Sequence, residues 1–285
     1  MNKKKTNKIR IAIQGGFGAF HEMAAYGYFT DKDIEIVPQD TFKDLMLSLS
    51  NGKVDYAIMA IENSVAGSIL PNYKLLQESG EKIIGEIYLR IRQNLVALPG
   101  QRIRDIREVY SHPMAIMQCE KFFEKHPHIK LVDSIDTALS AKMIAEKKLK
   151  NVGAIASSLA ADMYKLETLA AGIETNKKNY TRFLILEING KRVSSIRNVN
   201  KASVYFTLSH EVGSLSKILS ILFYYNINLS KIQSMPVIGV RWQYQFYIDV
   251  EFDNYDRYIH ALQAVKPFTG SLGIMGEYSK GISII

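Results

Sequence analysis

Cysteine is almost absent from this chain of 285 residues, which contains only Cys119. A single cysteine excludes an internal disulfide, and a protein that does without disulfides fits a reducing cytoplasm. The six histidines show no spacing that is typical of metal ligands. We therefore expect a cytoplasmic protein without a metal site.

Long apolar runs are also absent. No run reaches the roughly 18 residues that a membrane-spanning helix needs. The basic start MNKKKTNKIRIAIQGG is not followed by an apolar segment and a cleavage site. We therefore expect no signal peptide and no membrane partner.

The net charge of +8 is compatible with nucleic acid or with a small anionic substrate. The Lys and Arg residues are scattered, and no basic stripe is interleaved with aromatic residues as a nucleic-acid reader would need. The sequence therefore favours a small anion and predicts no nucleic-acid partner.

Strand and helix patterns alternate over the first 190 residues. Isoleucines alternate along residues 9–13, a helical pattern follows over 19–28, and 54–61 is typical of a strand buried on both faces. Residues 86–98 are predicted to form one long strand. Such βα alternation predicts two small α/β lobes with a cleft between them, and ligands bind such folds at the carboxyl ends of strands.

The pattern changes after the polar stretch 189–201. Strands are predicted over 202–209, 227–238, 241–252 and 272–276, and helices over 214–225 and 255–265. The order βαββαβ predicts a ferredoxin-like domain.

Four polar segments directly follow apolar strands of the α/β region. They are GGFGAFHEMAA from Gly15, AIENSVAG from Ala60, SHPMAIMQC from Ser111 and NYTRF from Asn179. Each one alone is as typical of a turn or a helix cap as of a binding site. A glycine turn that leads into a helix can present backbone N–H groups to a carboxylate or phosphate. Because all four segments can face one cleft, together they favour a binding site.

These segments resemble the landmarks of monofunctional prephenate dehydratases that carry a C-terminal ACT domain, and the resemblance covers nearly the whole chain. The order and spacing agree throughout. The landmarks stand here as GGFG at 15–18, AIENS at 60–64, SHPM at 111–114 with Gln118 and Cys119, AIASSLAADMY from Ala154, and TRF at 181–183.

The resemblance implies the fold and the domains. We expect an α/β two-lobed catalytic region, similar to periplasmic binding proteins, over residues 1–190. Lobe 1 would comprise about 8–85 with 175–190, and lobe 2 about 86–174. A linker over 191–200 would lead to an α+β ferredoxin-like ACT regulatory domain over 201–285.

The resemblance also implies a reaction, the conversion of prephenate to phenylpyruvate, water and carbon dioxide in phenylalanine biosynthesis. Aromatisation drives this reaction, so no cofactor is expected. The enzyme would be a carbon–oxygen lyase. Its expected catalytic residues are Thr181, Asn63, Ser111, Gln118 and Arg182, and its expected substrate-binding residues are Glu62, Ser64, Gly18, Ala19, Ser157 and Phe183.

Individual roles follow from the chemistry of the side chains. Arg182 can clamp a carboxylate through its fork of donors. Thr181 would donate a hydrogen bond to the departing hydroxyl, and its contribution would come from position in a dry site rather than from acidity. Glu62 is expected to orient its neighbours or to pair with Arg182, because an unpaired carboxylate beside a dianionic substrate is costly.

The ACT domain of this family binds phenylalanine at a subunit interface. The expected effector-binding residues are Val212, Gly213, Ser214, Leu215, Ser216, Asn228, Leu229 and Ser234. The chain departs from the family at Gln233 and Met235, where Glu and Arg are usual, and this makes phenylalanine inhibition an open question. In the catalytic region Ala19 and His21 replace hydroxyl residues, and Met114 replaces Gln.

Two other interpretations remain open. Arogenate dehydratase takes the amino form of the same substrate, and a non-catalytic amino-acid sensor would share the fold. The TRF triplet at 181–183 argues against a sensor. A chorismate mutase segment is not expected, because no long helical pattern precedes Ile9. Since ACT domains usually pair side by side, we expect a homodimer or homotetramer.

Overall fold

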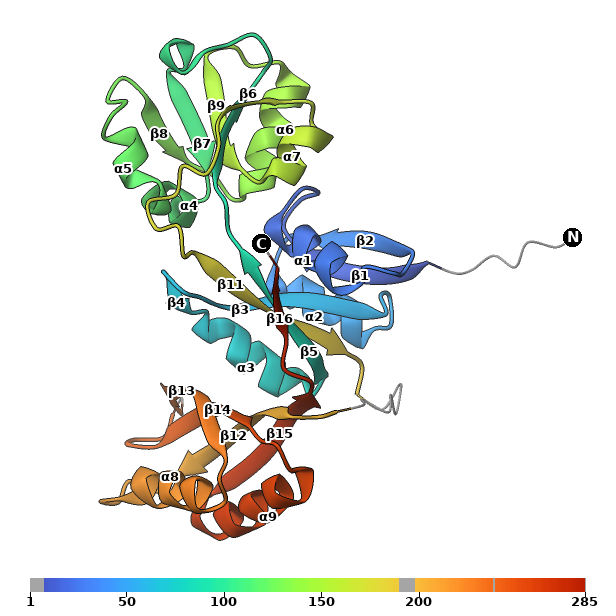
Figure 1. Ribbon diagram of the computed structural model, residues 1–285, viewed down its shortest axis with the longest axis vertical. Coiled ribbons are helices and arrows are strands. Elements are labelled where there is room, and N and C mark those ends of the chain that lie inside the picture. Colours follow the sequence, from blue (N-terminus) through green and yellow to red (C-terminus); the bar gives the residue numbers. More distant parts are fainter. Residues whose placement is uncertain (1–7, 190–197, 238, 285) are drawn as a thin grey trace, which may run out of the picture. The chain divides into compact units, whose positions relative to one another are not determined.

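A computed structural model describes residues 8–189, 198–237 and 239–284 (Figure 1). The chain divides into two compact units. The first unit consists of residues 1–69, 87–183 and 283–285, and the second of residues 70–86 and 184–282. None of the described helices is long and apolar enough to cross a membrane.

The first unit contains two lobes, each with its own sheet. In lobe 1, β1 (Ile9–Gln14) pairs in parallel with both β2 (Ile34–Gln39) and β3 (Tyr56–Asn63). The strand order is β5-β11-β3-β1-β2, with β5 at Lys82–Arg90 and β11 at Tyr180–Glu187. The short β4 (Gly67–Ser68) pairs with β3.

Helices α1 (Phe20–Tyr28) and α2 (Phe42–Ser50) follow the first two strands. Thr41 caps α2, because its side chain accepts a hydrogen bond from the backbone of Asp44. The apolar run of β3 is confirmed as a buried strand, since residues 56–61 are all buried.

Lobe 2 carries a five-stranded sheet in the order β10-β6-β9-β7-β8. Its strands are β6 (Asn94–Ala97), β7 (Glu108–Ser111), β8 (Lys130–Asp133), β9 (Val152–Ala156) and β10 (Glu167–Ala170). Its helices are the 3-10 turn η1 (Ile103–Asp105), α4 (Pro113–Gln118), α5 (Glu120–Phe123), α6 (Thr137–Lys147) and α7 (Ser158–Met163).

Alternating side chains give this sheet two apolar faces. Val96, Ala154 and Ala156 pack under α6 and α7, whereas Leu95 and Ile155 pack under α4 and α5 (Figure 1). Cys119 lies in the second of these cores and is fully buried, and burial together with the charge of Glu174 raises the pKa of its thiol to about 12.

The prediction of one long strand over residues 86–98 is wrong. The chain forms β5, leaves the extended ladder at Ile91–Gln93, and resumes as β6 in the other sheet. At the break the N–H of Ile91 bonds the carbonyl of Asn179, and the N–H of Gln93 bonds the carboxylate of Glu174. The polar break exists because the segment passes from one lobe to the other.

The second unit has the predicted order βαββαβ. It consists of β12 (Lys201–Leu208), α8 (Ser214–Tyr224), β13 (Asn228–Pro236), β14 (Tyr244–Glu251), α9 (Tyr255–Val265) and β15 (Ser271–Tyr278). The antiparallel order is β13-β14-β12-β15. The turn η2 (Lys266–Phe268) precedes β15, and β16 (Ile282–Ile284) follows it. β14 starts three residues later than predicted, and residues 191–197 of the predicted linker lie outside the described residues.

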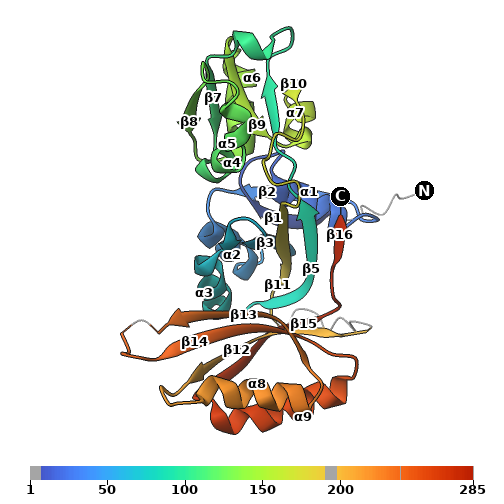
Figure 2. The same cartoon turned by 60° about the vertical axis from the view of Figure 1, so that its left-hand side comes forward.

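Helices cover both faces of the antiparallel sheet. α8 and α9 lie side by side on one face (Figure 2), over a core that includes Phe206, Val250 and Tyr258. On the other face, α3 (Leu70–Ser79) is held by a 2.5 Å hydrogen bond from Tyr247 to Gln77. β12, in the interior of the sheet, is therefore buried on both of its faces.

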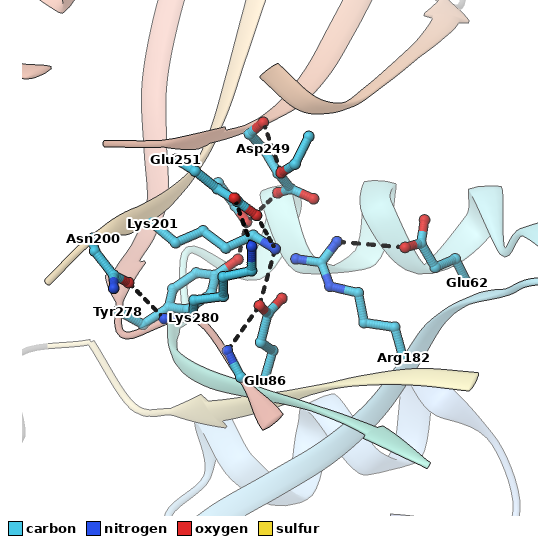
Figure 3. A network of polar contacts seen from close by, with 12 residues as sticks. Glu62, Glu86, Arg182, Asn200, Lys201, Asp249, Glu251, Tyr278 and Lys280 are labelled. Atoms are coloured by element: carbon cyan, nitrogen blue, oxygen red, sulfur yellow. Dashed lines mark hydrogen bonds and ion pairs between the residues drawn. The ribbon is translucent and has the colours of Figure 1, made fainter. Parts of the chain in front are cut away.

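A buried charge network fixes the start of β12. The ammonium of Lys201 lies 2.9 Å from Glu86 and 3.5 Å from Glu251, and both Lys201 and Glu86 are almost fully buried (Figure 3). Lys280 pairs with the far oxygen of Glu251, and Glu86 also accepts the N–H of Gly281. Burial alone would raise the pKa of Glu251, but the hydrogen bond from Lys280 and the two lysine charges outweigh it and lower that pKa.

Replacing Lys201 by Met is expected to lower the free energy of unfolding by about 3–5 kcal/mol, because it leaves the buried carboxylate of Glu86 without its cation. Urea unfolding measures this loss. Lys280→Met is the matched control in the same network. The side chain of Lys280 is 56% exposed, so its loss should cost less than about 1 kcal/mol. Equal losses in the two variants would contradict the assignment.

Candidate active site

A cavity of about 550 Å³ lies in the first unit and takes its walls from both lobes. Lobe 1 contributes residues from β3, β11 and the starts of α1 and α2. Lobe 2 contributes residues from the break at 91–93 and the starts of α4 and α6. The lining residues are Gln14, Ala19, Phe20, His21, Asp40, Thr41, Phe42, Ala60, Asn63, Ala66, Ile69, Ile91, Gln93, His112, Met114, Ala115, Gln118, Ile135, Asp136, Thr137, Thr181 and Phe183.

Helix starts, rather than basic side chains, supply the positive ends that face the cavity. Among the described residues that line it there is no Lys or Arg, and its two carboxylates are Asp40 and Asp136. Four helices, α1, α2, α4 and α6, begin at its wall. The positive ends of helix dipoles and their backbone N–H groups stabilise negative charge nearby.

The structure brings five of the predicted catalytic and substrate-binding residues together in this cavity. They are Asn63, Gln118, Thr181, Ala19 and Phe183. Six others do not line it, namely Ser111, Arg182, Glu62, Ser64, Gly18 and Ser157.

Strand alternation separates Thr181 from Arg182. Thr181 and Phe183 point into the cavity, and Arg182, between them on β11, does not line it. Arg182 is 3% exposed and lies 3.8 Å from the carboxylate of Glu62 (Figure 3). Its guanidinium carbon lies 6.0 Å from the centre of the Tyr88 ring. The expected pairing with Glu62 is therefore present, but the expected carboxylate clamp does not reach the cavity.

The predicted serines hold the backbone instead of facing the cavity. The hydroxyl of Ser111 is fully buried and donates to the carbonyl of Ile155, which joins β7 to β9. Ser157 caps α7 and donates to the carbonyl of Gly18 at 2.5 Å. Ser64 accepts the N–H of Tyr180. These contacts fix the walls of the site.

The glycine turn is also structural to a large extent. The N–H of Gly18 is taken by the buried carboxylate of Glu22 at 2.6 Å, and those of Gly15 and Ala19 by backbone carbonyls. Gly18 has a φ of +87°, and a Cβ there would lie 2.7 Å from the Cα of Ala160. The N–H groups of Gly15, Gly18 and Ala19 are therefore already used by hydrogen bonds within the fold.

A chain of carboxamides runs along the polar wall of the cavity. It starts at Asn63, whose Oδ1 accepts the backbone N–H groups of Val65 and Ala66 at 2.9 and 2.8 Å. Because a backbone N–H can only donate, these two bonds decide which end of the amide is oxygen. The Nδ2 of Asn63 must then face β11, where it donates to the hydroxyl of Thr181 at 3.0 Å.

The same logic orients the next amides. Asn63 donates to Oδ1 of Asn179 at 2.7 Å, so the Nδ2 of Asn179 faces Gln118 and donates to its Oε1 at 2.9 Å. Gln93 also donates to that oxygen, through its Nε2 at 3.2 Å. Asn179, Gln118 and Gln93 are all buried. Two backbone groups thereby set the direction of four side chains.

This arrangement prepares the hydroxyl of Thr181 as a donor. Its oxygen accepts a hydrogen bond from Asn63, so its own proton points elsewhere. The side chain lines the cavity. A substrate oxygen in the cavity can therefore accept that proton as a hydrogen bond.

His21 completes the lobe 1 wall as a neutral aromatic residue. Its ring lies 4.9 Å from that of Phe183, edge to face, and 5.6 Å from that of Phe42. Its Nε2 accepts the N–H of Ala60 at 3.4 Å, so the proton is on Nδ1. Burial lowers the pKa of His21 from 6.5 to about 3.

His21 should therefore make folding sensitive to acid. Its pKa is lower in the folded than in the unfolded state, so its stabilising contribution is complete above pH 6.5 and is lost as the pH falls from 6.5 towards 3. We expect His21→Gln to flatten the fall of unfolding free energy over this range, measured by urea unfolding at several pH values. His128→Gln removes an exposed histidine of the same unit and should not flatten it.

Comparisons with known proteins agree with the geometry. The family model described as prephenate dehydratase matches residues 11–191. A bifunctional chorismate mutase/prephenate dehydratase of Enterobacter agglomerans is 31% identical over 98% of this chain and 72% of its own length. The chain belongs to the prephenate dehydratase family.

Two further relatives extend the comparison within the prephenate dehydratase family and its neighbours. Arogenate dehydratase 2 of Petunia hybrida is 37% identical over 95% of this chain and 72% of its own length. The crystal structure of a prephenate dehydratase from Arthrobacter aurescens in complex with L-Phe superposes with a TM-score of 0.84. It is 26% identical and covers 95% of this chain and 90% of that one.

Several residues in or beside the cavity were not predicted as site residues, and they differ in how visible they are in the sequence. Asn179 stands in NYTRF, two residues before Thr181. Gln93 interrupts the alternation of apolar residues over 86–98, and a polar residue at such a position could have been predicted as a site residue. The cavity placement of His112, Asp40 and Asp136 depends on the tertiary fold.

The predicted effector residues form two groups within the second unit. Residues 212–216 lie at the start of α8, where Gly213 has a φ of +81°. Asn228 and Leu229 start β13 after the other end of α8, and a helix of 11 residues is about 16 Å long. Ser234 lies six residues further along β13, and Asn228 and Leu229 of one copy do not lie at the start of α8.

No group of three or more His, Cys, Asp or Glu that could hold a metal occurs within residues 8–189, 198–237 and 239–284.

Proposed function

We propose that the protein catalyses the decarboxylating dehydration of prephenate to phenylpyruvate. The observation that carries the proposal is the hydroxyl of Thr181, which Asn63 holds as a donor at the wall of a cavity with apolar sides. Membership of the prephenate dehydratase family gives the reaction class.

The reaction needs one leaving carboxylate and one leaving hydroxyl. The bond between the ring and its carboxylate breaks and releases carbon dioxide, its electron pair enters the ring, and the hydroxyl leaves the opposite carbon. Thr181 stabilises the departing oxygen by a hydrogen bond, and one proton taken up from solvent converts the departing hydroxide to water. Placement of the donor and exclusion of water supply the rate enhancement.

The cavity walls match both the carboxylate that leaves and the carboxylate that is retained. Phe42, Ile91 and Phe183 give the leaving carboxylate an apolar environment, which weakens its hydration and favours its loss as neutral carbon dioxide. The start of α1 binds the carboxylate that is retained. Gln118 orients the substrate without adding charge. Arg182 acts through Glu62 and β11 and does not touch the substrate.

Arogenate is the second candidate substrate. The 37% identity to an arogenate dehydratase supports it. So do the carboxylates of Asp40 and Asp136 in the cavity, since arogenate has an ammonium where prephenate has a keto group.

The first test is turnover of prephenate by Thr181 variants. Thr181→Ala should lower kcat by roughly 10²–10⁴ because the placed donor is lost, and Thr181→Ser should stay within about tenfold of wild type. Formation of phenylpyruvate is measured by its absorbance. Thr168→Ala, at an exposed position of β10, controls for an unspecific effect of losing a threonine. Unchanged turnover in Thr181→Ala would refute the role.

The βαββαβ order of the second unit supports its assignment as a ferredoxin-like ACT regulatory domain over 201–285, joined through 191–200 to a catalytic domain over 1–190. The catalytic lobes are proposed to resemble periplasmic binding proteins. A phenylalanine site made by residues 212–216 of one copy and 228–234 of another would explain why one copy separates these groups. The assembly is then a homodimer or homotetramer, and the lone Cys119 supports a reducing cytoplasm.

Phenylalanine should inhibit prephenate turnover, and Asn228→Ala should weaken that inhibition about tenfold or more without changing turnover in its absence. Inhibition curves and light scattering measure the two parts of this proposal. A monomer, or inhibition that is unchanged in Asn228→Ala, would contradict an interface site. Turnover of wild type that is indifferent to phenylalanine would show that Gln233 and Met235 belong to an altered site.

A further inference from the structure

The chain of carboxamides ends in an acceptor without a partner. Gln93 is 3% exposed and lines the cavity, and its Oε1 has no hydrogen-bond partner among the residues that the structure describes. A buried acceptor left unpaired is destabilising. Gln93 lines the cavity, so a ligand that brings a donor within reach of this buried oxygen would satisfy it.

The identity of this atom as oxygen follows from the rest of the chain. The oxygen of Gln118 already accepts from Asn179, whose direction is set by Asn63. The end of Gln93 that faces Gln118 must therefore be its NH₂ group, which leaves its oxygen as the unpaired end. Turning the amide of Gln93 over would set two oxygens against each other.

We propose that Gln93 is a specificity-determining residue whose Oε1 accepts a hydrogen bond from a donor group of the bound substrate. This inference rests on the proposed function. Prephenate has one donor, its ring hydroxyl, and arogenate has that hydroxyl and an ammonium. Either group satisfies the oxygen.

The same contact distinguishes substrate from product. The ring hydroxyl leaves as water, and the keto form of phenylpyruvate has neither a hydroxyl nor an ammonium. Phenylpyruvate therefore cannot satisfy Gln93, and a site that must pair a buried acceptor disfavours a ligand that lacks the donor. Gln93 thus favours the binding of substrate over the binding of phenylpyruvate.

The test compares wild type with Gln93→Met, which keeps the length of the side chain and removes its acceptor. We expect KM for the substrate to rise about tenfold, with a smaller change in kcat, because the contact is made in the ground state. The inhibition constant of phenylpyruvate should stay the same within about twofold. A role confined to the architecture of the site would raise both constants together.

Prephenate and arogenate are the two arms of the measurement. A rise of KM for both substrates identifies the hydroxyl as the donor, and a rise for arogenate alone identifies the ammonium. Unchanged KM for both, or an equal rise in the phenylpyruvate constant, overturns the proposal. Gln93→Asn keeps the amide but withdraws it by one methylene, and it should give a smaller rise of KM.

Asn94→Ala is the matched control. Asn94 is the neighbouring buried carboxamide, it does not line the cavity, and its hydrogen bonds go to the backbone of Ala156 and Gly172. It should lower the unfolding midpoint without changing the ratio of KM to the phenylpyruvate constant. Wild type that turns over neither substrate would refute the proposed function. If the wild type turns over substrate and the Gln93→Met variant has the same KM, only the role of Gln93 is refuted.

Discussion

The oxygen of the Asn63 side chain accepts two backbone N–H groups, and the polar geometry of the cavity depends on that pair of bonds. Once this oxygen is fixed, the amide nitrogen must face β11, and each following carboxamide has one permitted direction. A set of neutral side chains thereby gains a defined pattern of donors and acceptors. Neutrality matters because a dianionic substrate would be repelled by carboxylates placed at the same positions.

A second constraint comes from the way the chain passes between the lobes. It crosses at Ile91–Gln93 and returns before β11, so Gln93 and Asn179 are brought together although 86 residues separate them. The helices of both lobes begin at the cavity because parallel βα units place every helix start at the carboxyl end of a strand. The proposed binding of an anion by helix ends would therefore follow from the fold and would need no lysine or arginine at the wall.

Much of the fold could be predicted from the sequence. Period-two and period-3.6 patterns placed most strands and helices within a few residues. The prediction of one strand over 86–98 is wrong because alternating apolar residues occur on both sides of the change of sheet. The orientation of Arg182 could have been predicted, because adjacent residues on a strand face opposite sides and Thr181 was expected in the site. The resemblance of the TRF triplet favoured Arg182 as a catalytic residue instead.

The finer site could not be predicted because it depends on hydrogen bonds between distant residues. Asn63 and Asn179 are 116 positions apart, and Gln118 and Asn179 are 61 apart. No local pattern shows that the N–H of Gly18 is already used by Glu22, or that Ser111 bonds Ile155. Such contacts are decided by packing, and packing is a property of the whole chain.

Cys119 gives the second lobe a built-in reporter of local opening. Its thiol is buried in the core under α4 and α5, next to Gln118, and its raised pKa keeps it protonated near neutral pH. A thiol reagent can reach it only after that core opens. Because the chain has no other cysteine, the rate of modification would report the opening of this one core, at the wall where Gln118 meets the cavity.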